Sequence, residues 1–94
     1  MKINVKFISP LDKMIEKHEK KLILEISRQT LLHLFEYIAD SHPKIHEIIC
    51  TKDNKLNQGI ICVLNNELVL ANEIGNLKLN DNDEIVFSIA IAGG

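Results

Sequence analysis

The sequence predicts an α+β domain in which a mixed sheet of four to five strands packs against one main helix. Apolar and polar residues alternate with a period of two near both ends of the chain, which is typical of strands with one buried face. Between them, apolar residues recur at helical spacing over 30–41. The length of 94 residues suits a single domain over 1–94, and 46% apolar residues indicate a globular chain.

Two strands are expected before the helix. In the segment 2–8, every second residue is apolar, and the predicted buried face consists of Ile3, Val5 and Phe7. Pro10 ends this strand because proline lacks the amide proton that a β-ladder needs. The segment 21–27 repeats the alternation, with a buried face of Leu22, Leu24 and Ile26. Strands this close in sequence usually pair in antiparallel fashion.

The segment 11–20 links these two strands. Four of its residues fall at helical spacing, namely Leu11, Met14, Ile15 and His18. The remaining residues are charged, so both a short helical turn and a solvated loop fit the pattern. Charge runs usually face water, and we therefore expect a solvated connector rather than a surface for docking a partner.

The helix over 30–41 is the best-defined element of the sequence. The Thr30 hydroxyl can cap its first turn. An apolar stripe at i, i+3, i+4 and i+7 follows, made of Leu31, Leu34, Phe35 and Ile38. Pro43 ends the helix because the residue before a proline avoids the α region. The stripe predicts a face that packs on the sheet.

The segment 44–83 is less regular. Ile45, Ile48 and Ile49 suggest a further turn of helix, and the apolar run Ile60 to Leu64 predicts a strand buried on both sides. Turns are expected at Asn65-Asn66 and at 80–83, with a short return strand over 68–70. Two isolated apolar anchors lie between these turns, Leu77 and Leu79. A last strand from Glu84 to Ile91 would have Ile85, Phe87, Ile89 and Ile91 on one face.

Composition excludes several classes of protein. The formal net charge of −2 argues against a nucleic-acid-binding protein, which would carry a basic face. The longest apolar run, 60–64, is far shorter than a membrane span, and the N-terminus lacks the apolar stretch of a signal peptide. A cytoplasmic protein is therefore expected. Cys50 and Cys62 then fit buried, reduced thiols, although a disulfide between them stays open.

Residue patterns typical of enzymes and metal sites are weak. The chain has neither a glycine-rich phosphate loop nor a G-x-S-x-G turn. His42, His46 and Cys50 are spaced by four residues, but Pro43 disturbs a helix there and a fourth zinc ligand is missing. The acidic residues at 81–84 lack the spacing of a calcium loop. We expect no metal site and no catalytic residue in this chain.

The C-terminus carries the clearest functional feature. A strongly apolar strand leads directly into Ala92-Gly93-Gly94, a tail with almost no side-chain bulk. Glycine has no Cβ, so such a tail can enter a narrow channel of another enzyme and present its carboxylate to ATP. A frayed terminus is the simpler alternative, because chain ends commonly are frayed.

From Gly59 to Gly94 the chain resembles ubiquitin-related modifiers and the small subunits of molybdopterin synthase, which are β-grasp sulfur carriers. The matching features are the strand end Val63-Leu64-Asn65-Asn66, the turn Leu79-x-Asp81-x-Asp83, the strand start Ile85-Val86-Phe87, and Gly93-Gly94. The resemblance implies a ubiquitin-like β-grasp fold. It also implies that the chain is not an enzyme but a carrier on which partner enzymes act.

The resemblance further implies a mechanism. An E1-like enzyme would adenylate Gly94 with ATP and magnesium, and sulfur from a persulfide would then convert the terminus into a thiocarboxylate. Gly93, Ala92 and Ile91 would be recognised as the tail, and Phe87 would belong to the surface that contacts partners. The carrier itself would bind no permanent cofactor, no nucleic acid and no membrane.

The sulfur acceptor separates two branches of the family. The preferred branch is the ubiquitin-related modifier, which serves a tRNA thiolase in wobble-uridine 2-thiolation and whose activated tail can also join lysines of target proteins. The alternative is the small subunit that works with the large subunit of molybdopterin synthase. Ala92 before the diglycine is common in the latter, whereas the former typically has histidine there. A β-grasp interaction domain without carrier activity is the third alternative.

Overall fold

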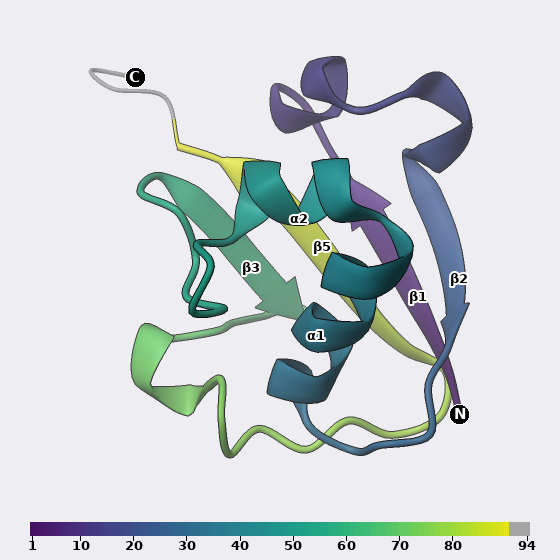
Figure 1. Cartoon of the computed structure of the whole chain (residues 1–94). Helices are drawn as coiled ribbons and strands as arrows, with labels where there is room; N and C mark the ends of the chain where they lie inside the picture. The colour runs from purple at the N-terminus through teal and green to yellow at the C-terminus, as the bar shows by residue number, and fades with distance from the viewer. Residues whose placement is uncertain (91–94) are drawn as a thin grey trace.

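A computed structural model shows a five-stranded mixed sheet with two α-helices on one of its faces (Figure 1). The structure describes residues 1–90. The strands are β1 (Lys2–Phe7), β2 (Lys21–Glu25), β3 (Ile60–Leu64), β4 (Glu67–Leu68) and β5 (Asp83–Ile89). The helices are α1 (Leu31–Ser41) and α2 (Pro43–Ile49). The predicted α+β class and mixed sheet are confirmed.

The first and last strands lie side by side at the centre of the sheet, whose order is β2-β1-β5-β3-β4. β1 and β5 are parallel, with Val5 opposite Ile85 and Phe7 opposite Phe87. β2 pairs antiparallel with β1, as predicted, and β3 pairs antiparallel with β5. The strand that leads to the C-terminus therefore has a neighbour on each side along its length.

The core lies between the sheet and the helices. The four stripe residues of α1 are fully buried, and the predicted inner face of β1 packs beneath them together with Ile85 and Phe87 of β5. The Phe87 ring stacks on Phe7 with centroids 5.6 Å apart and lies 6.1 Å from the Phe35 ring. Thr30 caps α1, because its hydroxyl oxygen accepts from the His33 amide at 3.3 Å. The amphipathic pattern thus located the main helix and its buried face correctly.

The expected turn after α1 is a second helix of seven residues, α2. Pro43 occupies its first turn, where a missing amide proton costs nothing. At its C-terminal end, the Asn57 side-chain amide donates to the carbonyls of Glu47, Ile48 and Cys50 at 2.9 to 3.2 Å. These bonds satisfy carbonyl groups that a helix end leaves unpaired.

The segment 11–20 forms two short 3-10 helices, η1 (Leu11–Met14) and η2 (Lys17–Glu19). Lys13, Lys17 and His18 face water, as expected of a connector, whereas Asp12 and Glu19 are half-buried. Leu11 and Ile15 nevertheless belong to the buried core, whereas Met14 is 58% exposed. The connector therefore also closes one end of the core.

The prediction that the run 60–64 is buried on both sides was wrong. Only Cys62 of β3 is fully buried, while Ile61 and Val63 are half-buried. Their side chains lie on the face of the sheet opposite the helices, and no element within residues 1–90 forms a further layer over that face (Figure 1). The turn at Asn65-Asn66 is confirmed, since both residues have positive φ angles of 47° and 72°.

The connection from β4 to β5 contains one element that the sequence did not predict, the 3-10 helix η3 (Ala71–Glu73). The return strand is two residues long, Glu67–Leu68, and is shorter than expected. Leu79 is a buried anchor and Leu77 a half-buried one, as predicted, and Ile74 is a third. Within residues 1–90, none of the helices has the length and apolar character needed to cross a membrane.

Candidate functional site

The predicted site is the C-terminal tail, and all of its residues lie outside the described range 1–90, namely Ile91, Ala92, Gly93 and Gly94. Their roles therefore remain predictions. The structure does describe the strand that leads to them. β5 ends at Ile89, and Ala90 follows it.

The end of β5 is held from both sides. On the β1 side, the Ile8 amide donates to the Phe87 carbonyl at 3.0 Å. On the β3 side, the Ala90 amide donates to the Gly59 carbonyl at 2.8 Å. The Ser88 hydroxyl adds a bond of 3.2 Å to the Ser9 carbonyl. The chain is thus fixed in place up to the residue that precedes the predicted tail.

Gly59 immediately precedes β3, the antiparallel neighbour of this strand end, and has a φ of +86°. Residues with a Cβ rarely adopt that conformation. A Cβ at this position would lie 3.7 Å from Ile89 Cγ1, which is ordinary contact. The backbone angle, rather than lack of space, is therefore what requires glycine beside the C-terminal end of β5.

The structure contradicts the prediction that Phe87 belongs to a partner surface. Its side chain has no exposed area and packs between Phe7 and Phe35. Side chains alternate along a strand, so Phe87 shares the inner face with Ile85 and is part of the core. The alternation was visible in the sequence and should have placed Phe87 inside the protein.

The residues next to Phe87 do reach the surface. Val86 lies opposite Val63, and Val63 lies opposite Leu68, so these three form one row on the open face of the sheet. Ile61, opposite Ser88, extends the row toward the end of β5. Leu68 is 60% exposed and Ile8, which follows β1, is 48% exposed. We call this the outer-face patch: Ile8, Ile61, Val63, Leu68 and Val86.

The other end of β5 is fixed by Asp83, a carboxylate that is 9% exposed. It accepts from the Asn80 amide at 2.7 Å and from the Asn65 side-chain amide at 2.8 Å. The Asn65 side chain in turn accepts from the Glu84 amide at 2.9 Å. The acidic cluster at 81–84 therefore joins the β3–β4 turn to β5, and its polar atoms serve structure as the sequence suggested.

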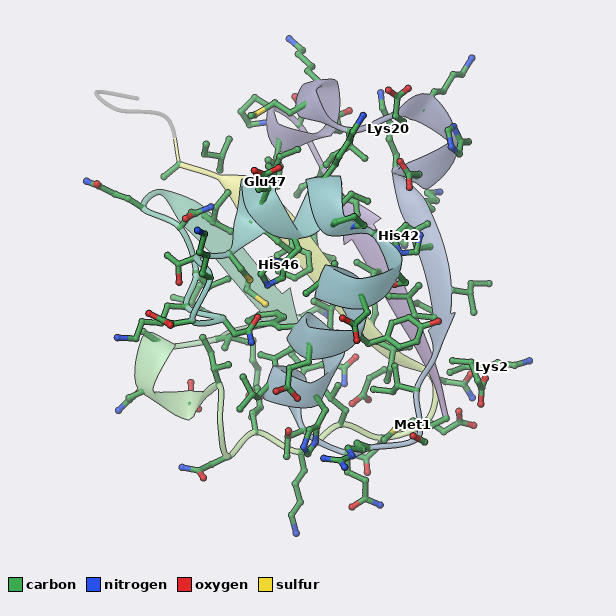
Figure 2. The ribbon with its side chains drawn as sticks, in the orientation of Figure 1. Met1, Lys2, Lys20, His42, His46 and Glu47 are labelled. Carbon is green, nitrogen blue, oxygen red and sulfur yellow. The ribbon has the colours of Figure 1, made fainter. Side chains whose placement is uncertain are left out.

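The histidine and cysteine residues do not converge on one point. His42 Nε2 lies 3.8 Å from Glu19, while His46 Nε2 lies 2.6 Å from Asn54 Oδ1. Figure 2 shows the two imidazoles apart, His42 on the β2 side and His46 on the β3 side. Among residues 1–90, no group of three or more His, Cys, Asp or Glu side chains is arranged to hold a metal ion.

Both thiols are free and buried, as predicted. Burial raises the pKa of Cys50 and of Cys62 from 9.0 to about 12, and the nearby Cys50 adds to the rise at Cys62. A thiol with such a pKa is not a nucleophile at neutral pH, because the thiolate is the reactive form. The two cysteines are therefore packing residues.

Comparisons with known proteins agree with this architecture. The model of the Urm1 family, "ubiquitin related modifier", matches residues 2–94. A search of curated proteins found no match. SAMP1 from Haloferax volcanii has a similar structure, with 15% identity, a TM-score of 0.75 and full coverage of both chains.

Two further solved structures show the same fold. Urm1 from Trypanosoma brucei is 19% identical with a TM-score of 0.69, over 99% of this chain and 95% of that one. A putative molybdopterin converting factor, subunit 1, from Pyrococcus furiosus is 16% identical with a TM-score of 0.68, over 97% and 99%. The ubiquitin-like β-grasp fold is thus confirmed, and the match of the family model along the chain shows that this protein belongs to the Urm1 family of ubiquitin-related modifiers.

Proposed function

We propose that this protein is a ubiquitin-like sulfur carrier whose C-terminal Gly94 is activated by an E1-like enzyme. The observation that carries the proposal is the position of β5. It is a central strand that is bonded as far as Ser88 on the β1 side and as far as Ala90 on the β3 side, and four residues of the sequence follow Ala90. A partner enzyme can thus bind the folded domain while the tail enters the active site of that enzyme.

The chemistry needs only the terminal carboxylate from this chain. A carboxylate oxygen of Gly94 attacks the α-phosphorus of ATP, and pyrophosphate leaves. The terminal sulfur of a persulfide on a partner then attacks the acyl carbon, and AMP leaves. A second thiol cleaves the resulting acyl disulfide, which leaves a thiocarboxylate on Gly94 and a disulfide on the partner. Magnesium and ATP belong to the activating enzyme, and the carrier holds no permanent cofactor.

The outer-face patch is the surface that we propose for the activating enzyme. It replaces Phe87 in that role, because Phe87 is buried and Val86 faces outward. The patch follows β5 toward its C-terminal end, so an enzyme seated on it has the tail within reach. Half-exposed apolar side chains gathered on one face are typical of protein interaction sites.

We propose the tRNA wobble uridine as the main sulfur acceptor, through a tRNA thiolase that binds the carrier. The same activated tail would form isopeptide bonds with lysines of target proteins. Membership of the ubiquitin-related modifier family supports this branch. Two free thiols support a cytoplasmic setting, where cysteines stay reduced.

Two observations favour a second candidate function, the small subunit of molybdopterin synthase. Ala92 precedes the diglycine, and the fold is also that of a putative molybdopterin converting factor subunit. In that case the tail would enter the active site of a large catalytic subunit. Stable co-purification with such a subunit, together with conversion of a molybdopterin precursor, would identify this branch.

The test is the intact mass of the protein after incubation with a cognate E1-like enzyme, Mg-ATP and a persulfide donor. The carrier proposal expects a mass change equal to replacement of one oxygen by sulfur. When a tRNA thiolase and its acceptor tRNA are added, the tRNA branch expects retarded migration of that tRNA on a mercury-containing gel. Omission of ATP and deletion of Gly94 are the controls, and both should abolish the change. An unchanged mass with an active enzyme would contradict the proposal and favour a plain interaction domain.

A further inference from the structure

β2 is an open edge of the sheet. It pairs with β1 on one side only, and Figure 1 shows no element of residues 1–90 beyond its other side. The opposite edge, β4, is two residues long and offers little backbone to a partner. An edge strand presents unpaired N–H and C=O groups that can pair with another strand. β2 is the edge long enough to do so.

The register fixes which groups of β2 point outward. Met1 and Ile26 exchange two hydrogen bonds, of 2.8 and 3.0 Å, and the Phe7 amide donates to the Lys20 carbonyl at 2.9 Å. Because the direction of the bonds alternates along a strand, Leu22 and Leu24 also bond to β1. The backbone groups of three residues are left for a partner: Lys21, Ile23 and Glu25.

The side chains of the same three residues lie on the outer face, because Leu24 and Ile26 are buried on the inner one. Ile23 is 72% exposed, the most exposed of the large apolar side chains within residues 1–90. Glu25 keeps 69% of its side chain exposed while it pairs with the Met1 ammonium at 3.1 Å. Figure 2 shows Met1 near the C-terminal end of β2. Lys21 forms no ion pair in the described part of the chain.

This strand is complementary to itself. If a second β2 runs antiparallel with Ile23 opposite Ile23, then Lys21 of each copy lies opposite Glu25 of the other. Opposite charges and apolar side chains are both favourable cross-strand pairs. The three residues that face each other in this register are also the three whose backbone groups point outward. Charge, side-chain size and hydrogen-bond direction therefore agree on a single register.

We propose that β2 is a homodimer interface, at which a second copy of this chain adds its β2 to make one continuous sheet across a two-fold axis. β1 separates β2 from β5, so pairing at this edge leaves the end of β5 uncovered in both copies. The dimer would then present two tails at once. This inference does not rest on the proposed sulfur chemistry, and its test requires no activating enzyme.

The complex should be weak. Two five-residue strands bury less than the ~1,200 Å² of a stable specific interface, so we expect a dissociation constant of about 10 µM or weaker. Sedimentation equilibrium between about 20 µM and about 1 mM covers that range. The mean mass should rise with concentration toward twice the monomer mass. In about 1 M salt, where charges are screened beyond about 3 Å, the association should weaken several-fold.

Charge variants test the register. Glu25→Lys places Lys opposite Lys in both cross-strand pairs, and Lys21→Glu places Glu opposite Glu. Each change should weaken self-association about tenfold, because two favourable pairs become two unfavourable ones. A mixture of the two variants restores both opposite-charge pairs, so it should associate at least as well as the natural chain. Loss of the Met1 ion pair in Glu25→Lys cannot produce this recovery.

Amide hydrogen exchange provides an internal control. The Ile23 amide points outward and should become protected as the concentration rises, whereas the Leu24 amide is bonded to β1 and should not change. A monomer at about 1 mM would overturn the proposal and leave an extended strand of another protein as the occupant of the edge. If the natural chain associates but Glu25→Lys and Lys21→Glu associate equally well, the proposed β2 interface is also overturned.

Discussion

The backbone amide of Ala90 donates to the carbonyl of Gly59 at 2.8 Å, and this is the last described contact before the predicted tail. The bond extends the β3–β5 pairing by one step beyond Ile89. It requires Gly59 at a φ of +86°, so a residue far from the C-terminus in sequence determines where the tail begins. This pair of residues therefore contributes both to the stability of the strand end and to the proposed carrier function.

Replacement of Gly59 should cost stability through backbone conformation alone. Gly59→Ala should lower the free energy of unfolding by about 1–2 kcal/mol, because a Cβ disfavours positive φ. Gly75→Ala is the matched control. A Cβ on Gly75 would meet no atom within 4 Å and its φ is not positive, so the replacement should be neutral or stabilising by up to about 1 kcal/mol. Urea unfolding of both variants distinguishes them, and equal stabilities would contradict the account.

Substitutions at Phe87 and at Val86 should have separate effects, the first on stability and the second on binding of the activating enzyme. Phe87→Ala leaves a cavity between Phe7 and Phe35 and should cost about 3–5 kcal/mol. Val86 lies on the outer face, so Val86→Ser should change the unfolding free energy by less than about 1 kcal/mol.

The same Val86→Ser protein should require a higher concentration to saturate the activating enzyme, because it loses part of the outer-face patch. The measurement is ATP–pyrophosphate exchange as a function of carrier concentration. Unchanged saturation in Val86→Ser would exclude this face as the docking surface, while the core role of Phe87 would still stand.

Asp83 should contribute more to stability than an exposed carboxylate. Asp83→Ala leaves the amides of Asn80 and Asn65 without their acceptor and should cost about 1–3 kcal/mol. Asp53→Ala, at an exposed turn, should stay within about 0.5 kcal/mol of the natural chain. Thermal unfolding compares the two variants, and an equally small loss in both would show that the Asp83 bonds add no net stability.

The two buried thiols should make the fold sensitive to alkali. Burial raises the pKa of Cys50 and Cys62 to about 12, so the unfolded chain releases these protons near pH 9 while the folded chain keeps them. The unfolded state then binds fewer protons, and the free energy of unfolding falls between about pH 9 and about pH 12. Each thiol contributes roughly 1 kcal/mol per pH unit to that fall.

The control for this prediction is the double variant Cys50→Ala and Cys62→Ala. It should be less stable at pH 7 because it loses packed side chains, yet its stability should fall less steeply above pH 9. The two proteins differ only at these two positions, so the difference in slope isolates the thiols. If the free energy of unfolding fell equally steeply with pH in both proteins, the two thiols could not be the origin of the sensitivity to alkali.

The sequence predicted those elements whose periodicity is unambiguous. The alternation in β1 and the helical stripe of α1 placed Ile3, Phe7 and Leu34 in the core correctly. The central parallel pairing of β1 with β5 did not follow from the order of elements along the chain, because many different arrangements of strands in a sheet are compatible with that order. The apolar run at Ile61 and Val63 misled the prediction, since hydrophobicity alone does not reveal whether a second layer covers a strand.

The candidate site stays a prediction at its tail, because Ile91, Ala92, Gly93 and Gly94 lie outside the described residues. The partner surface was assigned to Phe87 through the family resemblance, and that assignment disagreed with the alternation of the strand. An aromatic residue in an alternating strand belongs to whichever face its neighbours bury, and Ile85 is buried. The outer-face patch joins β3, β4 and β5, so it depends on a register that only the fold supplies.

The most direct test of the account is tandem mass spectrometry of the C-terminal peptide after activation by the cognate E1-like enzyme with Mg-ATP and a persulfide donor. The account predicts a single sulfur atom in place of oxygen at the carboxyl group of Gly94. It also predicts that Cys50 and Cys62 remain unmodified thiols in the same sample. Sulfur found on either cysteine, or a Gly94 carboxylate unchanged by an enzyme that is active on its own carrier, would contradict it.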